Sequence, residues 1–203
     1  MGEADDVGAQ SLLLVDLDAA LVGAWEEEFA AWPSAVRTAV AGLETVTGVD
    51  ALMTAGNSYG QMDGGVDRIV ATHFPGVQRS VWAAIADQSR GYLPVGSAVV
   101  VATGSKVIPW LVYAPTMRVP RPLTGDLETA VHDAFWAALV AVDRHNRSAG
   151  AGGRISSVAS PGFGTGFGQV PPRRAAQLMA TAFRFWRTGA TASIFQRESE
   201  LEG

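Results

Sequence analysis

One stretch of the sequence decides the fold: Gly56-Asn57-Ser58-Tyr59-Gly60-Gln61-Met62-Asp63-Gly64-Gly65-Val66-Asp67. It follows residues 49–55, Val-Asp-Ala-Leu-Met-Thr-Ala, a short apolar run typical of a strand that is buried on both faces. Glycine tolerates positive φ angles and lets a ligand approach the backbone closely. Because ligands of open α/β sheets bind beyond the carboxyl ends of strands, this stretch predicts a ligand-binding loop.

A second glycine-rich loop lies at residues 161–168, Pro-Gly-Phe-Gly-Thr-Gly-Phe-Gly. It follows a predicted strand at 154–160 and leads through Pro171-Pro172 into a predicted helix that ends near Arg187. Backbone N–H groups in such a loop, together with the helix N-terminus, favour an anionic group. Either loop could be only a tight turn between strand and helix, but the two together favour a phosphate-containing ligand.

The familiar nucleotide-binding patterns do not fit these loops. Residues 162–168 read Gly-x-Gly-x-Gly-x-Gly, which does not match Gly-x-Gly-x-x-Gly at any offset, and they lack the Lys and Ser/Thr of a P-loop. The strand–helix unit at 11–32 has no glycine fingerprint either. An ordinary NAD dehydrogenase or an NTPase is therefore disfavoured.

Strands alternate with helices along the rest of the chain. The apolar patterns predict strands at 11–16, 35–41, 49–55, 96–103, 107–114 and 154–160, with a further short edge strand at 192–195. They predict helices from Asp18 to Trp32, at 66–73, 76–90 and 124–147, and from Pro171 to Arg187. This alternation indicates an α/β fold with a largely parallel sheet covered on both faces.

The composition narrows the function further. The chain has 203 residues, a formal net charge of −5, 17% charged residues and no cysteine. The length suits one domain over 1–203, and the lack of cysteine excludes disulfides, thiol nucleophiles and cysteine-held metals. The negative charge argues against strong nonspecific nucleic-acid binding. With no basic region typical of a signal peptide and no apolar run of 18 residues, we expect a soluble, cytoplasmic domain without membrane contact.

The residues around both loops resemble the macrodomain family. Residues 49–58 and 64–67 are similar to its first signature, a strand ending in an Asn-Ala-Ala-Asn-like segment followed by a Gly-Gly-Gly-Val-Asp-like loop. Residues 164–168, with Pro171 and Ala175-Ala176, resemble the second signature, and residues 112–115 resemble the intervening strand. The resemblance covers about 36–187 and leaves a strand–helix unit at about 11–34 as an N-terminal extension.

This resemblance implies a three-layer α/β/α sandwich with a mixed, largely parallel central sheet. It also implies binding of ADP-ribose, or of an ADP-ribosylated macromolecule, with no metal or further cofactor. Asn57 matches the residue that contacts the distal ribose, although an asparagine here could also serve only the turn. Asp67 matches the aspartate that closes the first loop, although it could be only a first-turn carboxylate of the next helix. The other ligand contacts implied are Gly64, Gly65, Val66, Gly164, Thr165, Gly166, Phe167 and Gly168.

The chain departs from the family pattern where many members carry an acidic residue that recognises adenine. Leu43 occupies that position, with Glu44 beside it, and Asp16 or Asp18 of the N-terminal unit are alternatives.

Other departures concern catalysis and anion binding. In some hydrolytic members a histidine follows the loop aspartate; here Ala71 stands at that place, with His73 two residues on. Arg118 suits either a phosphate of the ligand or a surface acid. Phe163 and Phe167 suit either a stack on the ligand or an anchor in the core.

Three functions remain open. In the first, Asn57 and Asp67 form a catalytic pair, and Asp67 orients or deprotonates a water that hydrolyses an ADP-ribosyl linkage. In the second, the chain binds ADP-ribose without turnover, as a reader. In the third, the fold is kept as an interaction module that has lost the ligand.

Overall fold

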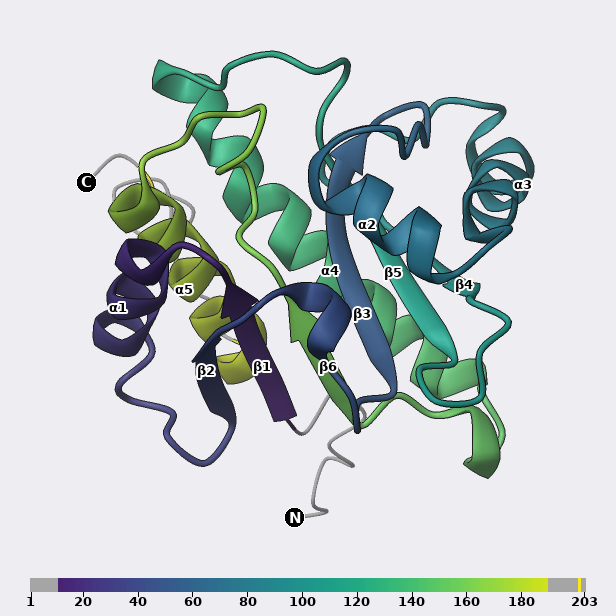
Figure 1. Ribbon diagram of the computed structural model, residues 1–203, viewed down its shortest axis with the longest axis horizontal. Coiled ribbons are helices and arrows are strands. Elements are labelled where there is room, and N and C mark those ends of the chain that lie inside the picture. The colour runs from purple at the N-terminus through teal and green to yellow at the C-terminus, as the bar shows by residue number, and fades with distance from the viewer. Residues whose placement is uncertain (1–10, 190–200, 202–203) are drawn as a thin grey trace.

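The structure is a computed structural model that describes residues 11–189 and Leu201 (Figure 1). Its strands are β1 (Ser11–Asp16), β2 (Val36–Val40), β3 (Ala51–Asn57), β4 (Val99–Ala102), β5 (Trp110–Met117) and β6 (Ser157–Ser160). These described strands form one sheet in the order β2-β1-β6-β3-β5-β4. Only β4 and β5 pair in antiparallel fashion, which confirms the expected mixed, largely parallel sheet.

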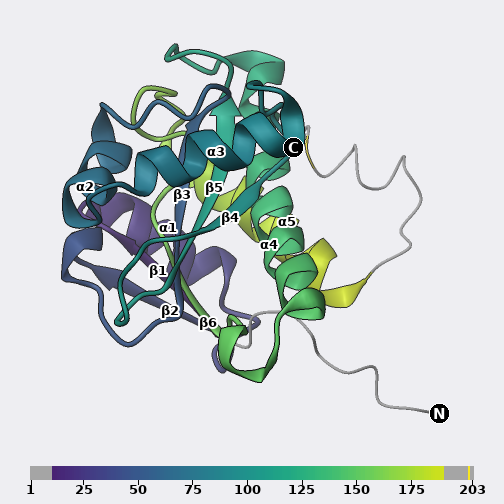
Figure 2. The same ribbon diagram turned by 90° about the vertical axis from the view of Figure 1, so that its right-hand side faces the viewer.

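Helices cover both faces of this sheet. They are α1 (Ala19–Glu28), α2 (Gly65–His73), α3 (Val77–Ser89), α4 (Ala130–Ser148) and α5 (Pro172–Thr188), with short 3-10 turns η1 (Leu43–Thr45), η2 (Gly125–Thr129) and η3 (Ala151–Gly153). Helices α1, α4 and α5 pack on one face, and α2 and α3 pack on the other. Figure 2 shows α4 and α5 on the side of the sheet opposite to α2. The arrangement is the α/β/α sandwich that the resemblance implies.

The alternation of side chains along the strands builds a separate core on each face. In β1, Leu12 and Leu14 join the core under α1, α4 and α5, whereas Val15 joins the core under α2 and α3. In β5, Val112 joins the core under α1, α4 and α5, and Tyr113 joins the core under α2 and α3. A strand with apolar residues on both faces is what a sheet covered on both sides requires.

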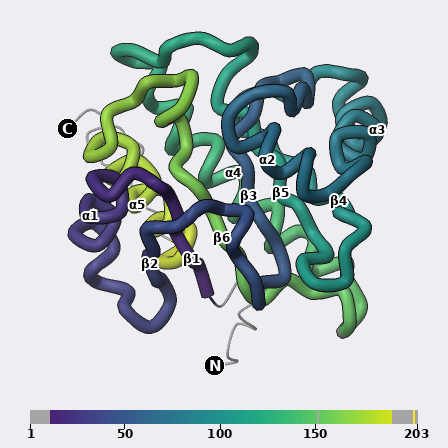
Figure 3. The backbone as a smooth tube through the Cα atoms, viewed as in Figure 1, coloured from purple at the N-terminus to yellow at the C-terminus, as the bar shows by residue number. Residues whose placement is uncertain are grey.

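The N-terminal strand lies inside the sheet. β1 pairs with β2 on one side and with β6 on the other, so the strand–helix unit contributes an interior strand. The carboxyl end of β1 therefore lies at the same edge as those of β6 and β3. In Figure 3 the two glycine-rich loops leave this edge, one from β3 toward α2 and the other from β6 toward α5.

Several predicted boundaries are wrong by a few residues. The strand expected at 107–114 runs from Trp110 to Met117, because Pro109 cannot donate to the strand ladder. β3 ends at Asn57, so that Asn57 belongs to the strand and not to the loop. The helix expected from residue 124 begins as the 3-10 turn η2, in which Gly125 has a φ of +58°. The strand expected at 192–195 lies outside the described residues.

Among the described helices, none is long and apolar enough to cross a membrane.

Candidate functional site

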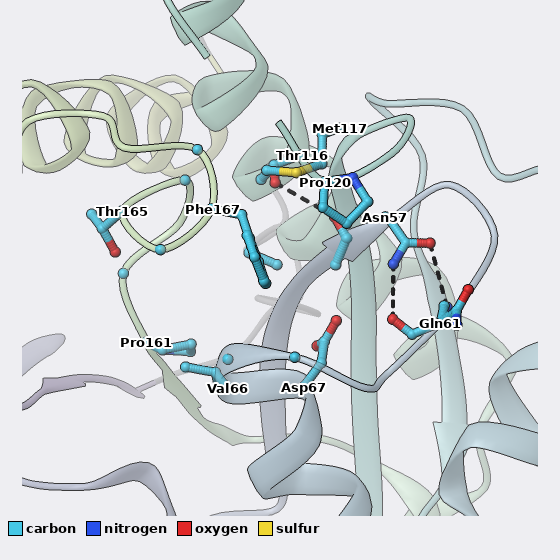
Figure 4. Close-up of a pocket in the computed structure, with 18 of the residues that line it drawn as sticks. Asn57, Gln61, Val66, Asp67, Thr116, Met117, Pro120, Pro161, Thr165 and Phe167 are labelled. Atoms are coloured by element: carbon cyan, nitrogen blue, oxygen red, sulfur yellow. Dashed lines mark hydrogen bonds between the residues drawn. The ribbon is translucent and has the colours of Figure 1, made fainter. Parts of the chain in front are cut away.

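A cavity of about 330 Å³ lies at the carboxyl ends of β1, β3, β5 and β6 (Figure 4). Both glycine-rich loops line it, and so does the start of α2. The structure brings together all ten residues that the resemblance places at a ligand: Asn57, Gly64, Gly65, Val66, Asp67, Gly164, Thr165, Gly166, Phe167 and Gly168. The volume is within the ordinary range of small-molecule sites.

Asn57 serves the turn that follows it. Its Oδ1 accepts hydrogen bonds from the backbone nitrogens of Tyr59 at 3.1 Å and Gln61 at 3.4 Å. Its Nδ2 donates to the carbonyl oxygen of Gln61 at 2.8 Å, as drawn in Figure 4. These bonds fix the orientation of the carboxamide at the cavity wall. Because an amide nitrogen carries two hydrogens, Nδ2 retains one donor for a ligand.

Asp67 lies in the first turn of α2 and is only 8% exposed. Burial raises the pKa of its carboxyl to about 7, and the charge of Asp63 adds to the rise. The hydroxyl of Thr54 lies close enough to oppose the shift, but it makes no regular hydrogen bond. Within the described part of the chain, Oδ1 of Asp67 has no hydrogen-bond partner. A carboxyl group that titrates near neutral pH in a cavity is suited to proton transfer.

The second loop is shaped by two glycines that no larger residue can replace. Gly164 has a φ of +75°, and a Cβ atom on Gly168 would overlap the carbonyl oxygen of Gly164. Hydrogen bonds from Leu123 to Gly168 at 2.7 Å and from Val170 to Gly164 at 3.1 Å hold the loop in place. Among described residues, the backbone N–H groups of 165–167 donate to no acceptor, so they remain free for an anion.

The two phenylalanines of this loop have different roles. Phe163 is fully buried and packs edge-on against Phe135, with ring centroids 5.3 Å apart, so it anchors the loop in the core. Phe167 is 57% exposed and lines the cavity. Its ring lies over Gly64, where a Cβ atom would come within 2.7 Å of Cε2 of Phe167. Phe167 thereby joins the two loops across the cavity.

The acidic residues of the N-terminal unit also reach the cavity. Asp16 and Asp18 both line it, whereas Leu43 is buried in the core and Glu44 faces a different surface hollow. Asp16 accepts hydrogen bonds from the backbone nitrogens of Asp18 at 3.0 Å and Gly162 at 3.2 Å. Asp18 is the N-cap of α1, with one carboxylate oxygen accepting from the backbone nitrogen of Ala20 at 2.9 Å.

The rest of the cavity wall comes partly from the two predicted loops and partly from residues outside them. Gly56, Gln61, Asp63, Pro161 and Gly162 belong to the predicted loops, although no ligand contact was expected of them individually. Nothing in the sequence indicated four further lining residues at or near the ends of β3 and β5: Ala55, Thr116, Met117 and Pro120. Their position at these strand ends can be recognised only once the strand boundaries are known.

Other candidates from the sequence lie away from the cavity. Arg118 is exposed, with its guanidinium 5.9 Å from the ring centre of Tyr92 and its Nε donating to the hydroxyl of Tyr59 at 3.4 Å. The guanidinium of Arg118 therefore contacts two tyrosines and does not line the cavity, so neither of the two roles suggested by the sequence is seen. Neither Ala71 nor His73 lines the cavity. No cluster of three or more potential metal ligands occurs in the described ranges.

The chain is similar to known proteins across most of its length. The sequence pattern of the family described as Macro domain matches residues 53–179. An uncharacterized protein of Aquifex aeolicus is 32% identical over 145 residues, which cover 71% of this chain and 79% of that protein.

Solved structures share the fold. A macrodomain of Oceanobacillus iheyensis with ADP superposes with a TM-score of 0.59 at 15% identity, covering 80% of this chain and 85% of that one. Thermosipho africanus DarTG, in complex with ADP-ribose, superposes with a TM-score of 0.51 at 19% identity, covering 70% of this chain and 36% of that one. At these identities the likeness shows the fold alone. The family match, which spans more than half of the chain and both glycine-rich loops, decides the assignment: the chain belongs to the Macro domain family.

Proposed function

We propose that this chain binds ADP-ribose, or a closely related ADP-ribosyl derivative, in the cavity between its two glycine-rich loops and hydrolyses an ADP-ribosyl linkage there. The observation that carries the proposal is Asp67, a buried carboxyl whose Oδ1 has no partner among the described residues and which lines the same cavity as the second loop. The backbone N–H groups of 165–167 in that loop donate to no described acceptor. The complex of Thermosipho africanus DarTG with ADP-ribose supports the choice of ligand.

The second loop is suited to the diphosphate. The free N–H groups of 165–167 can donate to phosphate oxygens at contact distance, where a backbone nest is effective without a nearby lysine or arginine. The net charge of −5 does not oppose this binding, because screening weakens long-range repulsion between charges more than about 10 Å apart.

The adenine end of the ligand is assigned to the N-terminal unit. Both carboxylate oxygens of Asp16 already accept hydrogen bonds, one from the backbone nitrogen of Asp18 and the other from that of Gly162. Asp18, in contrast, accepts with only one of its oxygens, which caps α1. The second oxygen of Asp18 is therefore the acceptor available to an exocyclic amino group. In this assignment Asp18 performs the role of the acidic residue that many family members carry at the position where this chain has Leu43.

At the other end of the cavity, Asn57 and Asp67 face the distal ribose. Deprotonated Asp67 accepts a proton from a water molecule as the water oxygen bonds to the anomeric carbon of that ribose. The bond from this carbon to the modified group breaks at the same time, and its electron pair leaves with that group. The leaving group then takes the proton that Asp67 received from the water, which leaves Asp67 deprotonated again. Positioned proton transfer of this kind contributes about 10²–10⁴-fold to a rate.

A second function is binding without turnover. It is favoured by the lack of an imidazole at the cavity, since position 71 is an alanine and His73 does not line the cavity. It is also favoured by the hydrogen bonds within the turn that already engage both ends of the Asn57 carboxamide. In this case the same cavity would hold a terminal or free ADP-ribose unchanged.

Release of ADP-ribose from an ADP-ribosylated substrate distinguishes the two functions. Wild type should release it, whereas Asp67→Asn, which keeps the side-chain shape, should slow release about 100-fold or more. Asp87→Asn on the exposed side of α3 is the matched control and should keep the wild-type rate. Wild-type binding without release would support the reader function. Equal release by wild type and Asp67→Asn would contradict the role of Asp67.

A further inference from the structure

Tyr113 makes an unusual pair of contacts with the end of β3. It is fully buried on β5, in the core under α2 and α3. Its hydroxyl accepts a hydrogen bond from the backbone nitrogen of Asn57 at 2.9 Å and donates one to the carbonyl oxygen of Asn57 at 2.8 Å. A single side chain thus satisfies both polar backbone groups of the residue that forms one wall of the cavity.

Asn57 lies where the strand pairing of β3 becomes irregular. β3 pairs with β6 only as far as Leu52 and Ala159, and its register with β5 shifts after Gly56 so that Asn57 lies opposite Met117. The carbonyl oxygen of Asn57 also accepts from the backbone nitrogen of Gly60 at 3.2 Å. A buried backbone group without a partner is costly, and the Tyr113 hydroxyl is a partner for both backbone groups of Asn57.

Gly56 makes room for the hydroxyl. A Cβ atom on Gly56 would overlap the hydroxyl oxygen of Tyr113 and crowd its ring carbons. Its φ is outside the positive range, so the glycine is required by this close approach and not by its backbone conformation.

We propose that Tyr113 is a positioning residue, whose hydroxyl holds the backbone of Asn57 so that the Asn57 carboxamide faces the ligand. Tyr113 does not line the cavity and acts only through Asn57. Burial and the charge of Asp67 raise the pKa of the Tyr113 hydroxyl, so it keeps the proton that it donates. The inference depends on the proposed function in one respect only: the measurement of ADP-ribose affinity has meaning only if the chain binds ADP-ribose.

The chain contains a matched control for this contact. The Asn146 carboxamide holds the backbone of Ile155 in the same way, accepting from its nitrogen at 2.7 Å and donating to its carbonyl at 2.8 Å. Asn146 is buried near the end of α4 and does not line the cavity. Tyr113→Phe and Asn146→Leu each remove one partner from a buried N–H and a buried carbonyl.

The test compares both variants with wild type by thermal unfolding, ADP-ribose titration and amide NMR. Both variants should lower the melting temperature, but only Tyr113→Phe should weaken ADP-ribose binding, by about tenfold or more. In ligand-free protein the Asn57 amide resonance should shift in Tyr113→Phe and stay in place in Asn146→Leu. Wild-type affinity in Tyr113→Phe, or an equal loss in both variants, would overturn the proposal.

Two readouts keep the proposal separate from the proposed function and from folding defects. If wild type does not bind ADP-ribose, the proposed function fails, yet the ligand-free Asn57 resonance still tests the contact. If Tyr113→Phe does not fold, the contact can be tested in the wild-type protein alone. The Tyr113 hydroxyl proton should then exchange slowly with water and show a nuclear Overhauser effect to the Asn57 amide proton. The absence of this effect would contradict the inference.

Discussion

A carboxylate oxygen of Asp16 and the backbone nitrogen of Gly162 are hydrogen-bonded at 3.2 Å, although the two residues lie 146 positions apart in the chain. The bond joins the end of β1 to the start of the second glycine-rich loop. It explains how the N-terminal strand–helix unit takes part in the cavity. The unit both lines the cavity and holds the loop that is proposed to bind the diphosphate.

Removal of this anchor should affect the ligand more than the fold. Asp16→Ala loses two bonds to backbone nitrogens, which should cost about 1–3 kcal/mol of unfolding free energy. The control is Asp50→Ala, because Asp50 accepts from the backbone nitrogens of Ser156 and Ser157 at the opposite end of the sheet, and also from the hydroxyl of Ser157. Chemical denaturation should show a loss for Asp50→Ala at least as large as that for Asp16→Ala, whereas titration should show weaker ADP-ribose binding only for Asp16→Ala. Equal affinity in the two variants would exclude the anchor role.

The buried carboxyl of Asp67 makes stability depend on pH. Its folded-state pKa of about 7 lies above the ordinary value of 3.8, so the folded protein retains a proton that the unfolded chain loses. Stability from this group is therefore lost as the pH rises from about 4 to 7 and is constant above that. At about 1.4 kcal/mol per pKa unit, a rise of about three units makes this loss on the order of 4 kcal/mol.

Asp67→Asn cannot lose this proton. The variant should be more stable than wild type at pH 8, and the difference should shrink toward zero near pH 4. Urea denaturation at several pH values measures it, and Asp87→Asn controls for the loss of one carboxylate. A difference that does not change with pH would show that Asp67 does not titrate as described.

Contact between the loops through Phe167 can be tested with Gly64→Ala. Gly64 has an extended backbone, so alanine is compatible with its φ and ψ, but the methyl group would displace the exposed ring of Phe167. We expect a melting temperature within a few degrees of wild type and weaker ADP-ribose binding. In a Phe167→Ala background the same change should have little further effect, since the displaced ring is already gone. Additive losses would mean that the two residues act independently.

The space beside Gly166 tests whether the second loop holds the ligand. Apart from the adjacent residues, no atom in the described part of the chain lies within 4 Å of a Cβ at Gly166 or at Gly150, and neither has a positive φ, so both accept alanine without strain. Only Gly166 lines the cavity. Gly166→Ala should fold normally and bind ADP-ribose about tenfold or more weakly, whereas Gly150→Ala should match wild type in both measurements. Unchanged affinity in Gly166→Ala would place the ligand elsewhere.

The sequence was sufficient to predict which segments meet at the site. Parallel strands bring their carboxyl ends to one edge, so a glycine-rich loop after β3 and another after β6 had to converge. For this reason all ten residues that the resemblance implied lie around one cavity. Phe163 and Phe167 could not be told apart, because only the packing of Phe163 against Phe135 separates an anchor from an exposed ring.

Other features depend on register and strand order, which local patterns do not encode. The Tyr113 contact lies at a shift of register between Gly56 and Asn57 that no sequence motif marks. The pKa of Asp67 is raised by burial in the folded chain and is opposed by Thr54, a neighbour on another element. The approach of Asp16 to Gly162 requires β1 to lie beside β6, and the sequence offered only a strand that preceded the macrodomain signatures.

The most direct test of the central claim is calorimetric titration of ADP-ribose into wild-type protein, with Gly166→Ala measured alongside. We predict saturable binding of one ADP-ribose per chain, with affinity reduced about tenfold or more in Gly166→Ala. The absence of heat with ADP-ribose, NAD or ADP-ribose phosphate at millimolar concentrations would contradict it. In that case the chain would keep the macrodomain fold as an interaction module without the ligand.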